Sequence, residues 1–348
     1  MNTSFKFGKF TVGLNSTFII AELSANHAGS LDNALRTVEA AKKAGANCIK
    51  LQTYTADTLT LDTDKDDFLI KGTIWDKRRM YDLYHEAHTP WSWHKKIFQL
   101  GEQLGLEVFS TPFDRTAVDF LEDLGVDAYK IASFEIGDIP LLNNVIEKNK
   151  PIIVSTGIAY RHEISKVVDI CREKGNYNLA LLKCTSNYPS LPSEANLANI
   201  CTLRKDFDTI VGLSDHSLTN NISIAAVALG AKIVEKHLIL DRSLGGPDCK
   251  FSLNPNEFTN LVNDIRMTES IIGSDSYELC ESAKISRDHR KSIYFAKKVK
   301  KGDRLTIDNI KVVRPGFGLS PDQYDDVLGK FANGDYDCGD RLTKDSFY

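Results

Sequence analysis

Short apolar and β-branched runs recur along the first two-thirds of the chain, and a stretch with helical spacing of apolar residues follows each of them. Alternation of buried strands with helices is typical of an α/β protein with a parallel sheet, and eight such units predict a closed (β/α)₈ (TIM) barrel. An open doubly wound sheet is the alternative. The eight runs are FIIAE (18–22), CIKLQ (48–52), EVFST (107–111), AYKIAS (128–133), PIIVST (151–156), LALLKCT (179–185), TIVGLSDH (209–216) and KIVEKHL (232–238).

Two segments fall outside this repeat. A long insertion of mixed charge spans about 53–88, directly after the second predicted strand. Long loops at this end of a barrel usually shape the active site. From 286 the chain reads as short strands and turns without barrel periodicity. We therefore predict a catalytic barrel at 1–285 and a small β-rich domain at 286–348.

Composition narrows the function class. The 348 residues carry a net charge of −4, which argues against a nucleic-acid partner. Apolar runs are too short to cross a membrane, and the N-terminus lacks the apolar stretch of a signal peptide. We expect a cytoplasmic protein whose thiols are free and mostly buried, because the seven cysteines are odd in number and without a CxxC pair. They are Cys48, Cys171, Cys184, Cys201, Cys249, Cys280 and Cys338.

Polar residues end all eight predicted strands. In a barrel the functional face is built from these carboxyl ends, whereas a strand buried on both faces would otherwise end in apolar residues. We therefore expect an active site here. The polar residues are, strand by strand, Glu22; Lys50 and Gln52; Ser110 and Thr111; Lys130, Ser133 and Glu135; Ser155 and Thr156; Lys183 and Thr185; Ser214, Asp215 and His216; Glu235 and His237.

Two histidines at neighbouring strand ends are candidate metal ligands. Glu235 and His237 are two positions apart, so on a strand they face the same side while Lys236 faces away. His216 ends the preceding strand. Two imidazoles would suit a divalent metal with open positions for water and a substrate carbonyl. The alternative is that each ring is hydrogen-bonded within a packed strand end.

Lys50 and Lys130, with hydroxyl side chains nearby, form a second candidate group. Cations and hydrogen-bond donors that converge on a small volume suit a phosphate and a carboxylate. Alternatively, the lysines pair with Glu22 and Glu135 as internal ion pairs. Lys50 is also a candidate for the Schiff-base lysine of an aldolase.

Taken together, these motifs resemble the sialic acid synthase family from end to end, and the tail resembles its small antifreeze-like (SAF) domain. Within the family, the insertion KGTIWDKRRMYDLYHEAHTPWSWH is similar to that of the pseudaminic acid synthases. Ser217 stands where threonine is common, and Cys249 stands where serine is usual. The motifs are IIAELSANHAGS, IKLQTY, STPFD, YKIASFEIGDI, IIVSTG, LLKCTSNYP, GLSDHS, VEKHLILDRSLGGPDCKFS and KKGDRLTIDNIKVVRPGFG.

The resemblance implies a role for each candidate residue. His216 and His237 would hold Mn²⁺ or Mg²⁺, and Arg314 would reach the site of the other subunit in a domain-swapped homodimer. Glu135, followed by Glu22, is the first candidate for moving the proton of the reacting water or of a sugar hydroxyl. The residues expected to bind phosphoenolpyruvate are Lys50, Thr111, Lys130, Ser133, Ser155, Ser186 and Ser214. Those expected to face the sugar and the water are Glu22, Gln52, Glu135, Tyr188, Glu235 and Asp248.

The implied reaction joins phosphoenolpyruvate to an amino-sugar aldehyde. For the pseudaminic branch the aldehyde is 2,4-diacetamido-2,4,6-trideoxy-L-altrose, and the products are pseudaminic acid and phosphate. Alternatives are the same chemistry on the N-acetylneuraminate or legionaminate precursor, a Schiff-base lyase, and a barrel without activity that serves as a binding protein.

Overall fold

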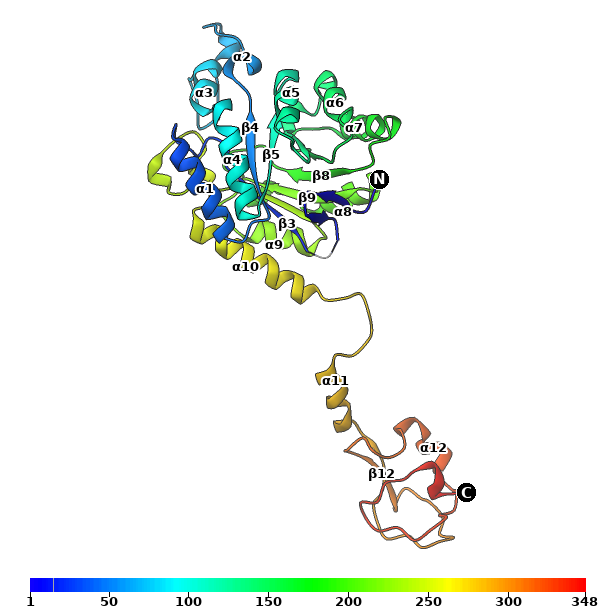
Figure 1. Cartoon of the computed structure of the whole chain (residues 1–348). Helices are drawn as coiled ribbons and strands as arrows, with labels where there is room; N and C mark the ends of the chain where they lie inside the picture. The colour runs from blue at the N-terminus through cyan, green and yellow to red at the C-terminus, as the bar shows by residue number, and fades with distance from the viewer. Residues whose placement is uncertain (15) are drawn as a thin grey trace. The chain divides into compact units, whose positions relative to one another are not determined.

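The computed structural model describes residues 1–14 and 16–348, which divide into two compact units, Met1–Gly273 and Ser274–Tyr348. In the first unit, eight parallel strands close into a barrel in the order β10-β3-β4-β5-β6-β7-β8-β9 (Figure 1). All eight predicted strands are present, which confirms the barrel and excludes the open sheet. They are β3 (Phe18–Glu22), β4 (Cys48–Thr53), β5 (Glu107–Pro112), β6 (Tyr129–Ile131), β7 (Ile152–Ser155), β8 (Leu179–Cys184), β9 (Ile210–Asp215) and β10 (Ile233–His237).

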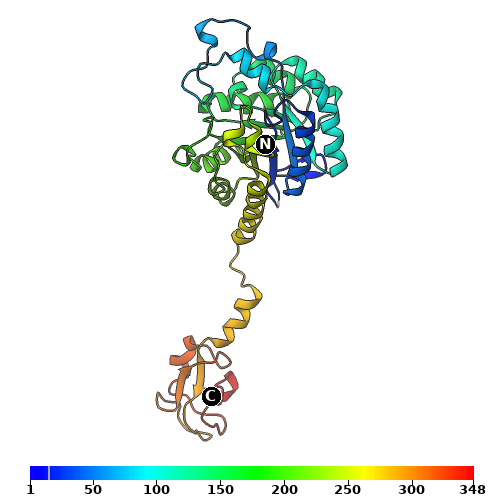
Figure 2. The same ribbon diagram turned by 90° about the vertical axis from the view of Figure 1, so that its left-hand side faces the viewer.

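Helices surround the strands of the first unit (Figure 2). Side-chain caps fix where several of them begin: Asp114 and Asp138 accept backbone N–H bonds at the starts of α5 and α6, and Asn254 does so at α10. The helices are α1 (Leu31–Lys43), α4 (Trp91–Leu104), α5 (Arg115–Asp123), α6 (Ile139–Ile146), α7 (Arg161–Glu173), α8 (Ala198–Phe207), α9 (Asn221–Ala228) and α10 (Pro255–Ile272).

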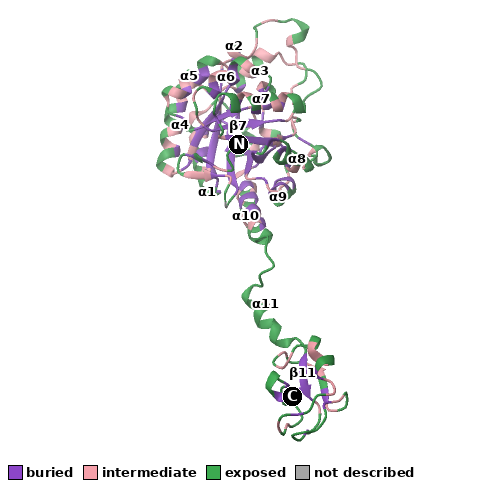
Figure 3. Cartoon of the chain, turned by 90° about the vertical axis from the view of Figure 1, so that its right-hand side faces the viewer, coloured by how far each residue is buried: buried purple, intermediate pink, exposed green. Residues whose placement is uncertain are grey.

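Alternate side chains of each strand point into the barrel, where they form an apolar layer and a polar layer. On β3, Ile19 and Ala21 pack outward beneath the helices, whereas Phe18 and Ile20 join an inward apolar cluster. A hairpin of β1 (Phe5–Phe7) and β2 (Phe10–Val12) adds its own apolar side chains to that cluster. Most residues of the barrel strands are buried (Figure 3), and Gln52, Glu107 and Lys183 are half-buried. Inward polar groups therefore lie toward the carboxyl ends of the strands.

The insertion at 53–88 follows the carboxyl end of β4 (Figure 1). It contains α2 (Ala56–Leu59), a 3₁₀ turn at Asp66–Phe68 and α3 (Met80–Ala87). Its exposed side chains form ion pairs within the segment, such as Arg78 with Glu86. The insertion is thus folded, and it lies at the end of the barrel where the sequence analysis places the active site.

The second unit contains α11 (Glu281–Ser286), the antiparallel pair β11 (Ser292–Phe295) and β12 (Ile310–Val313), and α12 (Tyr324–Val327). Isolated bridges join further extended segments, among them Val299 with Tyr336. Its core is small and includes Ile293, Phe295, Leu305, Ile310, Val327 and Leu342. The small β-rich module predicted for the C-terminal region is thus present, but the second unit begins at Ser274 and not at the predicted residue 286.

Cysteine placement corrects one expectation. All seven thiols are free, as predicted, but Cys48, Cys171 and Cys184 are the three that are buried. Cys280 and Cys338 are exposed because they lie in polar parts of the second unit. The prediction that the thiols are mostly buried was therefore wrong.

Among residues 1–14 and 16–348, no helix has the combination of length and apolar character that crossing a bilayer requires.

Candidate active site

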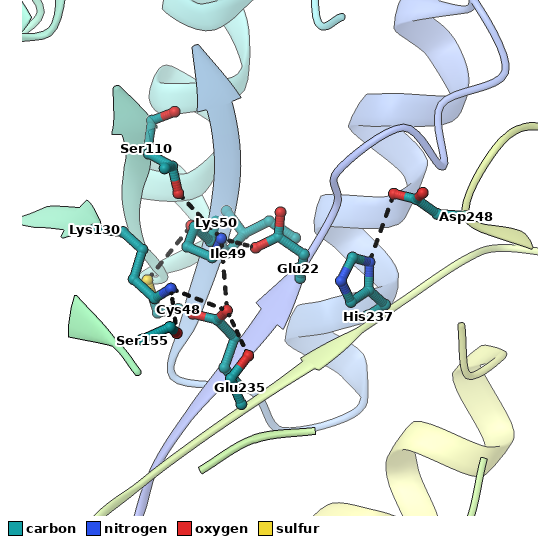
Figure 4. A network of polar contacts seen from close by, with 12 residues as sticks. Glu22, Cys48, Ile49, Lys50, Ser110, Lys130, Ser155, Glu235, His237 and Asp248 are labelled. Carbon is teal, nitrogen blue, oxygen red and sulfur yellow. Dashed lines mark hydrogen bonds and ion pairs between the residues drawn. The ribbon is translucent and has the colours of Figure 1, made fainter. Parts of the chain in front are cut away.

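Four charged side chains meet inside the barrel in the layer above the apolar cluster (Figure 4). Lys50 forms an ion pair with Glu22, and its Nζ also lies 3.6 Å from Oε1 of Glu235. Lys130 Nζ lies 3.6 Å from the same Glu235 oxygen. None of the four side chains is more than 5% exposed. The expected ion pair of Lys50 with Glu22 is therefore present, but Lys130 pairs with Glu235 and not with Glu135 as expected.

Hydroxyl groups complete the surroundings of both lysines. Lys50 Nζ donates to Oγ1 of Thr111 at 3.2 Å, and Lys130 Nζ donates to Oγ of Ser155 at 2.7 Å. Ser214 Oγ donates to Oε1 of Glu235 at 3.2 Å. Two cations and several hydroxyls within a buried volume can bind the oxygens of a phosphate and a carboxylate.

Burial and ion pairing together set the ionisation states of Lys50 and Glu235. Burial lowers the pKa of Lys50, but the carboxylates of Glu22 and Glu235 outweigh it and raise that pKa above its ordinary value. Burial raises the pKa of Glu235, yet Lys130 and Lys50 outweigh it and hold that pKa below its ordinary value. A Schiff-base lysine must lose its proton before it attacks a carbonyl. The ion pairs therefore disfavour the aldolase role for Lys50.

Two other carboxyl groups have near-neutral pKa values. Burial raises the pKa of Glu22 to about 7, although Lys50 lowers it. Burial also raises the pKa of Glu135 to about 7, and its Oε2 has no hydrogen-bond partner among the described residues. Glu135 lies in a 3₁₀ turn (Ser133–Glu135) directly after β6. A group that titrates near neutral pH and has a free oxygen is suited to proton transfer.

The two histidines converge at the ends of β9 and β10, with ring centroids 5.3 Å apart. His216 Nδ1 lies 3.0 Å from the carbonyl oxygen of Thr185, and because a carbonyl only accepts, Nδ1 donates this bond. Burial lowers the pKa of His216, but the neighbouring Cys184 thiol and the Thr185 carbonyl outweigh it and raise that pKa above its ordinary value. His237 Nδ1 is buried, lies 3.8 Å from Asp248 Oδ2 and has no hydrogen-bond partner among the described residues.

This pair fits a divalent ion that also takes water or substrate as ligands. The buried Nδ1 of His237 has no hydrogen-bond partner among the described residues, and imidazole nitrogens are ligands that such ions accept. Within residues 1–14 and 16–348, no group of three or more His, Cys, Asp or Glu side chains is arranged to hold a metal. His216 and His237 therefore stay a predicted pair of ligands, and any further ligands of an ion would come from water or substrate.

A buried ion pair lies behind the histidines. Lys236 Nζ is 2.6 Å from Oδ2 of Asp215, and that oxygen also accepts a hydrogen bond from Ser223 of α9. Lys236 therefore faces the helices while Glu235 and His237 face the barrel interior, as strand alternation predicts. The pair ties the end of β9 to β10 beside both histidines and fixes their relative position.

The remaining predicted residues lie at the same end of the barrel, with one exception. The Tyr188 ring is tilted against the His216 ring at a centroid distance of 4.4 Å, Asp248 accepts from the Ala25 N–H at 3.3 Å, and Gln52 is half-buried at the end of β4. Ser186 Oγ lies 3.8 Å from Cys184 Sγ. Arg314 is exposed after β12 in the second unit.

Sequence reasoning missed three contributors. Cys184 is buried beside His216, although alternation from Leu182 could have placed it inside the barrel. Phe251 packs against the His237 ring at 4.9 Å, and its loop gives no periodic signal. Gly157 brings a backbone N–H within 3.0 Å of Ser133 Oγ, and its lack of a side chain makes room for the serines.

The chain is similar to known proteins over nearly its whole length. It is 48% identical over 95% of its length to a pseudaminic acid synthase of Campylobacter jejuni, covering 96% of that protein. It is 41% identical to a pseudaminic acid synthase of Helicobacter pylori, with 90% of this chain and 93% of that one covered. The solved structure of an N-acetylneuraminic acid (sialic acid) synthetase from Leptospira borgpetersenii, in complex with citrate, matches with a TM-score of 0.74 at 32% identity, covering 81% and 94% of the two chains.

Family models match both units. The NeuB family model covers residues 37–277, and the SAF domain model covers 290–346. The first match spans more than half of the chain and contains all of the converging residues described above except Glu22. The chain therefore belongs to the NeuB family and carries a C-terminal SAF domain.

Proposed function

We propose that the chain is a pseudaminic acid synthase, a transferase that condenses phosphoenolpyruvate with 2,4-diacetamido-2,4,6-trideoxy-L-altrose and water to give pseudaminic acid and phosphate. The observation that supports this most directly is the 48% identity, over 95% of the chain, to a protein of that name. The converging cations, hydroxyls and histidines at the carboxyl ends of the strands are the groups that such a condensation requires.

Phosphoenolpyruvate would bind over the two buried lysines. Lys50 and Lys130 supply positive charge, and Glu22 and Glu235 leave the group nearly neutral until the anionic substrate arrives. The phosphate and carboxylate oxygens would accept hydrogen bonds from the lysines and from the hydroxyls of Thr111, Ser133, Ser155, Ser186 and Ser214. Hydrogen bonds between such charged groups are about twice as strong as neutral ones.

His216 and His237 would hold Mn²⁺ or Mg²⁺, and when bound the ion polarises the sugar aldehyde and stabilises the negative charge that develops on its oxygen. Thr185 fixes the orientation of His216 through the hydrogen bond at Nδ1. Asp248 lies beside the other ring, 3.8 Å from His237 Nδ1. Such outer partners orient ligating histidines in metal sites generally.

Carboxylate side chains would stabilise the positive charge that develops on phosphoenolpyruvate and accept the proton of the reacting water. C3 of phosphoenolpyruvate forms a bond to the aldehyde carbon, and positive charge develops at C2. Glu235, whose pKa is held below its ordinary value by Lys130 and Lys50 despite burial, stays ionised and stabilises that charge. Water then adds at C2 and gives its proton to Glu135, or to Glu22 as the second candidate. The bond between C2 and the phosphate oxygen breaks as the C2 hydroxyl becomes a ketone, and the proton of that hydroxyl leaves with the phosphate. The former aldehyde oxygen takes up the proton that the glutamate received and becomes a hydroxyl.

We also propose that the enzyme works in the cytoplasm as a homodimer with exchanged C-terminal domains. The seven free thiols are consistent with a reducing compartment. The second unit has a small core, and modules of this size gain stability from docking on another surface. Exchange of a domain between identical chains is a simple route to a twofold dimer.

Phosphate release across a panel of amino sugars tests the proposed reaction. We expect kcat/KM for 2,4-diacetamido-2,4,6-trideoxy-L-altrose to exceed that for N-acetylmannosamine by at least about 100-fold, because unpaired buried polar groups penalise the wrong sugar. Higher efficiency with N-acetylmannosamine would reject the pseudaminic assignment while keeping the condensation. Phosphate release with none of the sugars would favour a binding protein without activity.

Gly157→Ala is expected to raise the KM for phosphoenolpyruvate by about 10- to 100-fold, because displaced positioning groups cost that much. A Cβ at Gly157 would lie 2.2 Å from Ser186 Oγ and 2.9 Å from Ser133 Oγ, so both serines must move. Initial-rate kinetics measure the effect. Gly137→Ala is the matched control, because a Cβ there meets no atom within 4 Å. Equal KM values for the two variants would contradict the role given to the serines.

A further inference from the structure

One side chain of the insertion reaches the aromatic residues around the histidines. Trp75 is half-buried, and its indole Nε1 donates a hydrogen bond to the carbonyl oxygen of Pro247 at 3.0 Å. Pro247 immediately precedes Asp248 in the segment that follows β10. The bond therefore joins two loops of the barrel that are far apart in sequence, and it fixes the orientation of the indole ring.

Trp75 lies one ring further out than the residues that touch the histidines. Its ring centroid is 5.8 Å from that of Tyr188 and 6.4 Å from that of Phe251. Tyr188 lies 4.4 Å from His216, and Phe251 lies 4.9 Å from His237. We call Trp75, Tyr188 and Phe251 the aromatic cluster. Its ring contacts run without a break from the histidine pair to the insertion.

The aromatic cluster gives the sugar a direction in which to extend. An open-chain hexose spans about 6 Å from C1 to C6, since each C–C bond is about 1.5 Å long. If the aldehyde carbon lies beside the histidine pair and the carbon chain runs outward along Tyr188 and Phe251, its far end approaches Trp75, the ring next to both of them. At that end a 6-deoxy sugar carries a methyl group, whereas its ordinary counterpart carries a hydroxymethyl group.

We propose that Trp75 is a specificity-determining residue that contacts the C6 end of the aldehyde substrate and favours a 6-deoxy sugar over its 6-hydroxy counterpart. This inference rests on the proposed function, because it takes the aldehyde to react at the histidine pair. The methyl group packs on the ring face, which is apolar. A 6-hydroxyl would lose hydrogen bonds to water without replacement, because Pro247 already takes the only donor of the indole.

The test compares Trp75→Ala, Trp75→Phe and the wild type with two sugars, 2,4-diacetamido-2,4,6-trideoxy-L-altrose and the same sugar bearing a 6-hydroxyl. We expect the wild type to prefer the 6-deoxy sugar by about 10- to 100-fold in kcat/KM. Trp75→Ala should lose most of this preference through a higher KM for the 6-deoxy sugar, with the KM for phosphoenolpyruvate unchanged. Trp75→Phe should retain part of the preference because it keeps a ring.

Leu61→Ala is the matched control, because Leu61 belongs to the same insertion and is 65% exposed. Thermal unfolding of each variant confirms that the first unit stays folded. A ratio of efficiencies for the two sugars that is the same in Trp75→Ala and the wild type would overturn the inference while leaving the proposed function intact. A wild type that releases no phosphate with the 6-deoxy sugar would overturn the proposed function, and the inference with it.

Discussion

Replacement of His237 by alanine is expected to reduce phosphate release by about a thousandfold or more, and His216→Ala is expected to do the same. Each change removes one of two imidazoles whose rings lie 5.3 Å apart at the ends of neighbouring strands. The described part of the chain offers no third His, Cys, Asp or Glu arranged with them to hold a metal. Loss of one ligand should therefore abolish binding of the ion, and not merely weaken it.

Mn²⁺ binding to the metal-free protein, followed by electron paramagnetic resonance, separates this role from a structural one. We expect one ion per chain in the wild type and none in either variant. His94→Ala is the matched control, because His94 is also buried but bonds to Thr53 at 2.9 Å. That variant should unfold at a lower temperature and still bind Mn²⁺. Full Mn²⁺ binding and turnover in both His216→Ala and His237→Ala would remove the metal assignment.

Treatment of the wild type with EDTA extends the same prediction. Chelation should abolish phosphate release, and added Mn²⁺ should restore it. Borohydride in the presence of substrate should leave no adduct on the protein, because the Lys50 amine stays protonated beside Glu22 and Glu235. Irreversible inactivation by borohydride together with resistance to EDTA would favour the Schiff-base lyase instead.

The barrel could be predicted because each strand carries its own signal. A run such as IIVS is buried on both sides, and a helix with apolar residues at helical spacing follows it, so the repeat is visible without knowledge of tertiary contacts. The inward direction of Glu235 and His237 could also be predicted, since strand alternation is a local property. The position of Lys236 against Asp215 agrees with it.

The ion pairs that join strands on opposite sides of the barrel could not be predicted from local sequence in the same way. Glu235 is the residue that pairs with Lys130, and this contact depends on the stagger of strands on different sides of the barrel. Glu135 is closer in sequence to Lys130, but it lies in a turn beyond β6 and its carboxyl group remains without an ion-pair partner among the described residues. Sequence proximity was therefore a poor guide to the ion pairs.

Loop contributors were the hardest to foresee. Trp75 lies in an irregular part of the insertion, and only the fold brings it against Pro247. The insertion as a whole was correctly expected near the active site, because loops that follow barrel strands lie there. Which of its aromatic residues faces the site depends on turns that have no periodic pattern, so the sequence alone left that question open.

Mixing Arg314→Ala with His216→Ala is expected to restore activity that neither variant has alone. Arg314 is exposed directly after β12, and its guanidinium is a planar cation of the kind that binds carboxylates. If domains are exchanged between subunits, random mixing makes half of the dimers mixed, and each mixed dimer has one site with both residues intact. About a quarter of the wild-type activity should then return.

Phosphate release after controlled subunit exchange measures this recovery, and native mass spectrometry of the mixture measures the fraction of mixed dimers. Lys311→Ala is the matched control, because Lys311 is an exposed cation on β12 and should leave activity unchanged. Full activity of Arg314→Ala by itself would show that the arginine has no part in the reaction. Mixed dimers that form but stay inactive would mean that Arg314 and His216 must lie on the same subunit. If Arg314 acts on the barrel of its own chain, every site in a mixed dimer lacks either Arg314 or His216. Recovery in proportion to the mixed fraction, by contrast, has no explanation other than a site completed by the second subunit.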